Sequence, residues 1–259
     1  MRQWMGTSRS WLKIAAVALM AIGLAGCGRS ESYRYKLTLA VETPDGIKQG
    51  SSVVDVMFYD VSFPERGTMH TLHGEALYLD LGPGKRPLIA LLTRQLRDAS
   101  MRRGEYMRDF EERVRWNRDA GPGTRWLCQL YGFAPSEDYM DDVPRIARMR
   151  GAREIAPTDL PDLVTFADVN DPKTVIEVDP NDLEATLGPG VAWNKVTLES
   201  TDEPVTKGIE QKLTWLPGYF QNNLLLDGTD TGDFRITPRP LKNKLGWPDF
   251  VSFVWKRKH

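Results

Sequence analysis

Two of the three histidines in the chain lie in one short segment that also holds a carboxylate. His70, His73 and Glu75 are residue types that bind zinc or copper. A β-strand over this segment would place His73 and Glu75 on one face and His70 on the opposite face. The three side chains would then not converge. The spacing therefore favours polar histidines of a strand and a loop over a metal site.

Three aspartates recur at a spacing of three residues near the C-terminal end: Asp227, Asp230 and Asp233. Carboxylates in a flexible turn are typical calcium ligands, provided that several oxygen atoms converge. The spacing differs from that of an EF-hand, and aspartate and glycine are also the residues that solvated turns use. A calcium loop stays open as an alternative, but a plain polar turn is favoured. We therefore expect no metal ion and no other cofactor.

Six of the eight tryptophans follow residue 26. Trp193, Trp215 and Trp247 lie close to glycine or proline residues, where turns leave side chains open to solvent. Exposed indole rings can stack on the sugar rings of glycans, whereas buried rings fill a core. These three tryptophans are the candidate ligand-binding residues, and core packing is the alternative for each of them.

The signatures of common catalytic sites are missing from the sequence. The chain lacks the P-loop, the dinucleotide glycine fingerprint, H-E-x-x-H, G-x-S-x-G and C-x-x-C. Cys128 has apolar neighbours, which favours a buried and unreactive thiol. A hydrolase would have to use Asp168, Asp171 or His73, and the sequence names no nucleophile or base beside them. We therefore expect no catalytic residue.

The first 26 residues differ in composition from the rest of the chain. They contain Arg2, Arg9 and Lys13 and no acidic residue, and an apolar run of eleven residues extends from Ile14 to Leu24. A helix needs about 20 apolar residues to span a bilayer, so this run is too short. A basic start followed by a short apolar run is typical of a secretory signal peptide.

The signal ends in Leu24-Ala25-Gly26-Cys27, which resembles the lipobox of bacterial lipoproteins. The resemblance implies cleavage before Cys27, a diacylglyceryl group on its thiol, and usually an acyl chain on the new amino group. Such anchors hold a protein stably at a membrane. An ordinary signal peptide that is cut near Ala25 is the alternative. Gly28 replaces the aspartate of the inner-membrane retention signal, so the resemblance implies the outer membrane, facing the periplasm.

Charge is unevenly distributed along the chain. The 34 basic and 35 acidic side chains give a formal charge of −1, but the segment 235–259 holds seven basic residues and one acid. This basic end could contact anionic lipids, pack on the acidic body or flank a solvated strand, and the last two are favoured. An exported, net-acidic protein is not expected to bind nucleic acid.

Alternating apolar and polar residues predict strands in the first part of the chain, and glycine and proline mark the turns between them. The predicted strands cover 35–42, 53–61, 74–81 and 88–92. Thr43-Pro44-Asp45-Gly46 and Gly82-Pro83-Gly84 are the predicted turns. This order of strands and turns resembles small Ig-like or transthyretin-like modules of secreted proteins.

A helical pattern follows these strands, and strands then return. Apolar residues at helical spacing predict an amphipathic helix within 94–119. Further strands are predicted over 163–167, 174–178 and 191–198, a short helix over 203–216, and a last strand over 250–255. Leu-Gly-Pro-Gly occurs twice, at 81–84 and 187–190, and recurrent turn chemistry explains it better than a duplicated unit.

We therefore predict an α+β fold of mainly antiparallel strands, with a sandwich-like N-terminal part and a central amphipathic helix. The expected parts are the signal peptide 1–26, a β-rich module 27–93, a helical and loop-rich connection 94–162, and a second β-rich module 163–259.

The run Val-Glu-Thr-Pro-Asp-Gly at 41–46, followed by Gly-Ser-Ser at 50–52, resembles an uncharacterised family of bacterial envelope proteins. No activity follows from that resemblance. The favoured function is a lipid-anchored envelope protein that acts as a non-catalytic interaction or structural module. Its expected partners are the membrane, through Cys27, and another envelope protein. The alternative is a periplasmic lipoprotein that binds a glycan, a lipid or a metal.

Overall fold

The computed structural model describes residues 28–61, 67–94, 116–117, 121–230 and 241–252. Cys27, Asp233 and nearly all of the predicted helix over 94–119 lie outside these ranges. The chain forms two compact units, residues 1–30 with 59–69 and residues 31–58 with 70–259. In the smaller unit, the N–H of Asp60 donates to the carbonyl of Arg29 at 2.9 Å.

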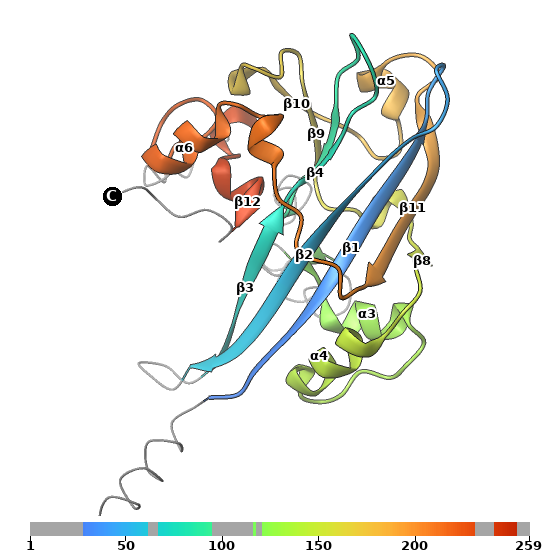
Figure 1. The fold of residues 1–259 in the computed structure, drawn as a ribbon, viewed down its shortest axis with the longest axis vertical. Helices are drawn as coiled ribbons and strands as arrows, with labels where there is room; N and C mark the ends of the chain where they lie inside the picture. The colour runs from blue at the N-terminus through green and yellow to red at the C-terminus, as the bar shows by residue number, and fades with distance from the viewer. Residues whose placement is uncertain (1–27, 62–66, 95–115, 118–120, 231–240, 253–259) are drawn as a thin grey trace, which may run out of the picture. The chain divides into compact units, whose positions relative to one another are not determined.

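A six-stranded sheet has the order β12-β3-β2-β1-β11-β8 (Figure 1). Its strands are β1 (Ser30–Glu42), β2 (Lys48–Val61), β3 (Gly67–Glu75), β8 (Arg153–Glu154), β11 (Ala192–Ser200) and β12 (Val251–Ser252). Strand β11 runs antiparallel to β1, in a register that pairs Leu37 with Leu198 and shifts between Ala40 and Val41.

A four-stranded sheet has the order β10-β9-β5-β4. Its strands are β4 (Leu77–Leu79), β5 (Leu88–Ala90), β9 (Leu163–Phe166) and β10 (Val175–Glu177), and each neighbouring pair is antiparallel. One residue, Ala76, separates β3 from β4, so a single run of chain serves both sheets. A short pair, β6 (Trp116–Asn117) and β7 (Gly121–Pro122), forms a third sheet.

The predicted α+β fold with mainly antiparallel strands is confirmed. Each of the two larger sheets contains strands from both segments 27–93 and 163–259, since β1 pairs with β11 and β5 pairs with β9. The two β-rich parts of the sequence thus share their sheets.

Alternate residues of the four-stranded sheet face two different hydrophobic cores. Leu88, Ala90 and Leu163 belong to the core that also contains most buried residues of β1 and β2. Ile89 and Val164 belong to the second core, which the C-terminal segments complete. Because both faces are covered, β5 is a continuous apolar run, and β9 is apolar except for the buried Thr165.

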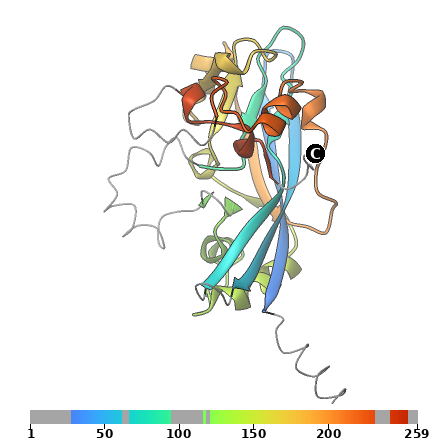
Figure 2. The ribbon, with the colours of Figure 1, turned by 90° about the vertical axis from the view of Figure 1, so that its left-hand side faces the viewer.

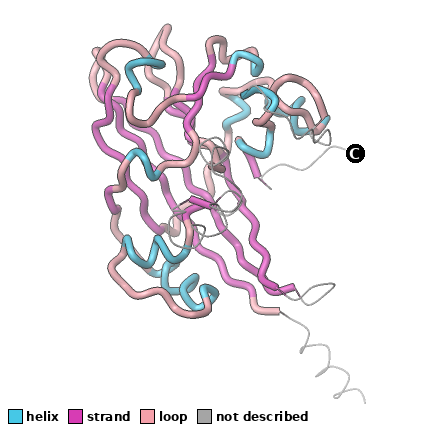
Figure 3. Tube along the Cα trace, turned by 180° about the vertical axis from the view of Figure 1, so that it is seen from behind, coloured by secondary structure: helices cyan, strands magenta, loops and turns pink. Residues whose placement is uncertain are grey.

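The helices are short and lie at the ends of the long strands (Figures 2 and 3). They are α3 (Thr124–Leu130), α4 (Tyr139–Arg148), α5 (Leu183–Leu187) and α6 (Leu216–Asn222). The described 3-10 turns are η2 (Pro157–Asp159), η3 (Pro172–Thr174), η4 (Ile209–Gln211), η5 (Leu241–Asn243) and η6 (Trp247–Asp249). None of the helices in the described ranges is long and apolar enough to cross a bilayer.

The helix predicted over 203–216 is wrong. The segment 201–208 contains no helix, and it is bound to β2 by two hydrogen bonds. The N–H of Thr206 donates to the carbonyl of Val53 at 3.0 Å, and the N–H of Val53 donates to Oγ1 of Thr206 at 2.9 Å. Gly208 has a φ of 115°, which ends the segment in a conformation that a helix does not use.

Candidate functional site

Strand β3 carries both predicted metal-ligating histidines, and the two have different neighbours. The His70 ring lies 6.0 Å from the Phe58 ring, measured between centroids. Nδ1 of His73 lies 4.0 Å from Oδ2 of Asp55 on β2. Across the residues with described positions, no group of three His, Cys, Asp or Glu side chains is arranged to hold a metal ion.

Buried carboxylates hold loops against the sheets. Glu75 is 1% exposed, and its Oε2 accepts a hydrogen bond from the N–H of Ile209 at 2.9 Å. Asp249 is 2% exposed, and its oxygens accept from Oγ1 of Thr93 at 2.7 Å and from the N–H of Gly246 at 2.8 Å. The sequence offered Glu75 only as a disfavoured metal-ligand candidate, and Asp249 was not among its candidate residues. The signal for Asp249 was its place three residues after Gly246, at the start of a turn.

Asp227 and Asp230 accept hydrogen bonds from neighbouring polar groups. Oδ1 of Asp227 accepts from the N–H and Oγ1 of Thr229 at 2.9 and 2.7 Å, and Oδ2 accepts from Nδ2 of Asn243 at 2.6 Å. Partial burial raises the pKa of Asp227, but the hydrogen bonds from Thr229 and from its own backbone, together with the charge of Lys242, outweigh burial and lower that pKa below its ordinary value. Oδ1 of Asp230 accepts from Nδ2 of Asn223 at 3.3 Å.

Asp168 and Asp171, the aspartates that a hydrolase would have used, stabilise their own loop. Oδ1 of Asp168 accepts from the N–H of Asn170 at 2.9 Å, and Oδ1 of Asp171 accepts from the N–H of Lys173 at 3.0 Å. Both are the short-range contacts of aspartate turns.

The three candidate tryptophans are partly buried, and each donates its indole N–H within the chain. For Trp193, Trp215 and Trp247 the acceptors are the carbonyl of Pro180, the carbonyl of Val169 and Oδ1 of Asn223, at 2.8, 3.0 and 3.1 Å. Each ring is thus fixed in one orientation, and part of its area packs on the protein.

Around helix α6 the structure gathers several of the predicted residues. The rings of Trp215 and Tyr219 lie 5.4 Å apart, and the Trp247 ring packs edge-on against Phe220 on the same helix. Partial burial raises the pKa of the Tyr219 hydroxyl, as do the nearby carboxylates of Asp171 and Asp227. We call Trp215, Tyr219, Trp247, Asp171 and Asp227 the α6 surface. Aromatic rings beside hydrogen-bond acceptors are a composition that suits a polar ring-shaped ligand.

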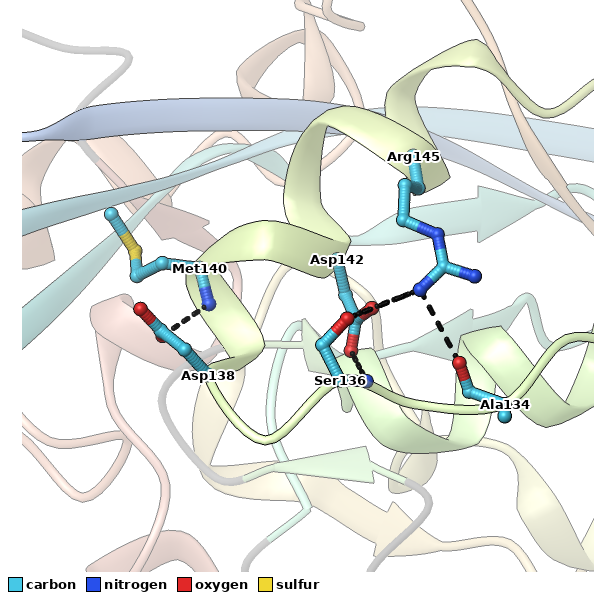
Figure 4. A network of polar contacts seen from close by, with 6 residues as sticks. All are labelled: Ala134, Ser136, Asp138, Met140, Asp142 and Arg145. Carbon is cyan, nitrogen blue, oxygen red and sulfur yellow. Dashed lines mark hydrogen bonds and ion pairs between the residues drawn. The ribbon is translucent and has the colours of Figure 1, made fainter.

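A network of polar contacts joins helix α4 to the segment that precedes it (Figure 4). Asp142 is 1% exposed and accepts from the N–H and Oγ of Ser136 at 2.9 and 2.8 Å. Nη1 of Arg145 lies 2.8 Å from Oδ1 of Asp142, and the Arg145 guanidinium stacks over the Phe133 ring at 4.3 Å. The network ties the segment before α4 to the helix.

The thiol of Cys128 faces this network from helix α3. Cys128 is fully buried, and burial together with the Asp142 carboxylate raises the pKa of its thiol to about 12. A thiol that stays protonated is a poor nucleophile. The predicted burial of Cys128 is confirmed.

A small cavity lies between β1, β2 and β5. It has a volume of about 10 Å³ and is lined by apolar side chains together with Tyr35, Ser52 and Glu75. That volume accommodates about one water molecule.

The fold and these contacts define an α+β protein of mainly antiparallel strands, in which the buried carboxylates of Glu75, Asp142 and Asp249 accept structural hydrogen bonds. No protein-family model, curated protein or solved structure matches the chain.

Proposed function

We propose that this protein is a lipid-anchored protein of the bacterial cell envelope whose folded part acts as a non-catalytic interaction module. The observation that carries the proposal is Leu24-Ala25-Gly26-Cys27 at the end of a signal peptide. Tyr33 in β1 is 2% exposed and follows Cys27 by six residues. Six extended residues span about 20 Å, so acyl chains on Cys27 would hold the fold close to a membrane.

The state of the buried polar groups supports an interaction role over a catalytic one. Cys128 is held protonated, and Glu75, Asp142 and Asp249 accept hydrogen bonds from backbone N–H groups. These contacts stabilise loops and helix ends. Gly28 after the acylated cysteine favours the outer membrane, facing the periplasm.

Metabolic labelling with palmitate tests the anchor. The full chain should take up the label in a bacterial host, Cys27→Ser should abolish uptake, and Cys128→Ser should leave it unchanged. A wild-type chain that is exported without label would overturn the proposal in favour of an ordinary signal peptide.

The α6 surface supports a second candidate, a lipoprotein that binds a glycan. Its specific observation is Tyr219, whose ring lies 5.4 Å from the partly buried Trp215 ring and whose hydroxyl lies near the carboxylates of Asp171 and Asp227. Peptidoglycan fragments should raise the melting temperature of the wild type and of Tyr139→Ala, whose ring is exposed on α4, but not of Tyr219→Ala. Absence of any shift for the wild type would contradict this candidate.

A further inference from the structure

The residues that directly follow Cys27 are held against the end of strand β2, within the smaller unit. Of that unit the structure describes residues 28–30, 59–61 and 67–69. A Cβ on Gly28 would lie only 2.8 Å from the carbonyl oxygen of Asp60, so this close approach requires glycine. The N–H of Asp60 also donates to the carbonyl of Arg29 at 2.9 Å. Because Cys27 precedes Gly28, its Cα lies one step of about 3.8 Å from a residue that contacts β2.

The end of β2 is paired with the start of β3. The two strands are neighbours in the six-stranded sheet, and their short connection makes them antiparallel. Oγ1 of Thr68 donates to Oδ1 of Asp60 at 3.0 Å, which shows that these two residues lie side by side. Antiparallel pairing then places Met69 opposite Tyr59. Since side chains alternate between the faces of a strand, both point to the face opposite Asp60 and Thr68.

This face of the smaller unit is apolar and open to solvent. Met69 is 53% exposed, and Tyr59 and Val61 are partly buried. We call Tyr59, Val61 and Met69 the hairpin patch. Tyrosine joins an apolar ring to a polar hydroxyl and is enriched at the boundary between water and lipid. Methionine is flexible and adapts to an irregular apolar environment. The composition of the patch therefore suits the surface of a bilayer.

We propose that the hairpin patch contacts the bilayer that holds the acyl groups of Cys27, with Met69 entering the boundary between headgroups and acyl chains. The proposal rests on the proposed function, whose membrane contact it assigns to named side chains. The position of Cys27 identifies the bilayer as the occupant. Acyl chains on that residue lie in the membrane, and Gly28 joins it to Asp60, the residue between Tyr59 and Val61.

The acyl anchor makes a contact of this small size sufficient. Even one long acyl chain binds a membrane only marginally, so three partly exposed side chains do not bind it alone. Once the acyl groups are inserted, the patch is confined beside the lipid at a high effective concentration, and its contact requires no further loss of overall motion. The contact should therefore form in the acylated chain and not in Cys27→Ser.

A fluorescent label at position 69 tests the contact in the full, acylated chain. Met69→Cys supplies an exposed thiol, whereas Cys128 is buried and the thiol of Cys27 would be acylated. The labelled protein is reconstituted in vesicles of phosphatidylethanolamine and phosphatidylglycerol. We expect emission shifted to the blue, and at least twofold quenching by phospholipids that carry a spin label on their acyl chains. Gln49→Cys, an exposed position near the start of β2, is the control and should show neither effect.

A second reporter leaves the hairpin patch intact. A Cβ on Gly67 meets no atom within 4 Å, and Gly67 lies on the same face of β3 as Met69, so Gly67→Cys should fold normally. Its label should be quenched in the acylated chain, and adding Met69→Asp should reduce that quenching at least twofold. Because Met69 is exposed, Met69→Asp should unfold at the same urea concentration as the wild type.

Three results would each overturn the proposal. They are equal spectra for labels at 69 and 49, quenching at 67 that Met69→Asp leaves unchanged, and a blue shift at 69 when Cys27→Ser is added to the same vesicles. Palmitate labelling separates failure of the patch from failure of the anchor. An acylated chain whose label at 69 stays in water removes the patch alone, whereas a chain without palmitate removes the anchor and the patch with it.

Discussion

Nζ of Lys85 lies 2.9 Å from Oδ2 of Asp45, and this ion pair fixes the β1–β2 turn to the loop after β4. The hydrogen bond and the charge of Lys85 lower the pKa of Asp45 below its ordinary value of 3.8. We expect Lys85→Gln to return that pKa toward 3.8 in an NMR titration of the Asp45 carboxyl.

The same pair makes a pH-dependent contribution to stability. Because the pKa of Asp45 is lowered in the folded state, the contribution is present above the ordinary value and is lost as the pH falls through the folded value. The wild type and Lys85→Gln should therefore differ less in urea unfolding at pH 2.5 than at pH 6, with ~0.1 M salt kept constant. A pKa of Asp45 that is identical in both proteins would contradict the ion pair.

Cys128 should be unreactive in the folded protein. Its thiol is buried and has a pKa of about 12, so a chain with Cys27→Ser should not react with iodoacetamide at pH 8 until guanidinium unfolds it. Since the pKa is raised above the ordinary 9.0, stability should fall as the pH rises from 9.0 toward 12. Rapid alkylation of the folded protein at pH 8 would show that the thiol is accessible.

Asp142 should be important for stability because it is buried and pairs with Arg145. Asp142→Ala removes the carboxylate that pairs with the Arg145 guanidinium and accepts from the Ser136 N–H, and we expect the free energy of unfolding to fall by about 3 kcal/mol. Asp141→Ala, at the exposed neighbouring position of α4, should cost less than about 1 kcal/mol. If urea denaturation shows that both variants lose the same free energy of unfolding, the stabilising role of the Asp142 network is ruled out.

Glu75 should act as a structural acceptor for the segment that ends at Ile209. Glu75→Ala removes the acceptor of the Ile209 N–H and should lower the free energy of unfolding by about 1–3 kcal/mol. Glu75→Gln keeps a carbonyl acceptor and should cost less, and Glu154→Ala on the exposed strand β8 serves as the control. If Glu75→Ala and Glu154→Ala have the same free energy of unfolding, Glu75 is not a stabilising acceptor for this segment.

The local elements of this fold could largely be predicted from the sequence. Apolar alternation over 35–42 and 191–198 corresponds to β1 and β11, and Thr43-Pro44-Asp45-Gly46 forms the expected turn. These signals are local, because side-chain alternation and proline and glycine geometry depend on neighbouring residues only.

The long-range relationships could not be predicted. The alternation of apolar and polar residues shows which side chains of a strand share a face, but not which strand lies next to it. The pairing of Leu37 with Leu198 therefore could not be predicted. The prediction of a helix over 203–216 failed for the same reason. The segment 201–208 makes its hydrogen bonds with Val53, about 150 residues away in the sequence. The α6 surface likewise depends on a contact between distant segments, since Asp171 lies near Tyr219.

The mass of the N-terminal peptide of the mature protein, purified from its own envelope, tests the central proposal most directly. We expect a peptide that begins at Cys27 and carries a diacylglyceryl group on the thiol, together with an acyl chain on the amino group where the host adds one. A mature chain that begins elsewhere, or that carries an unmodified Cys27, would contradict the lipid anchor.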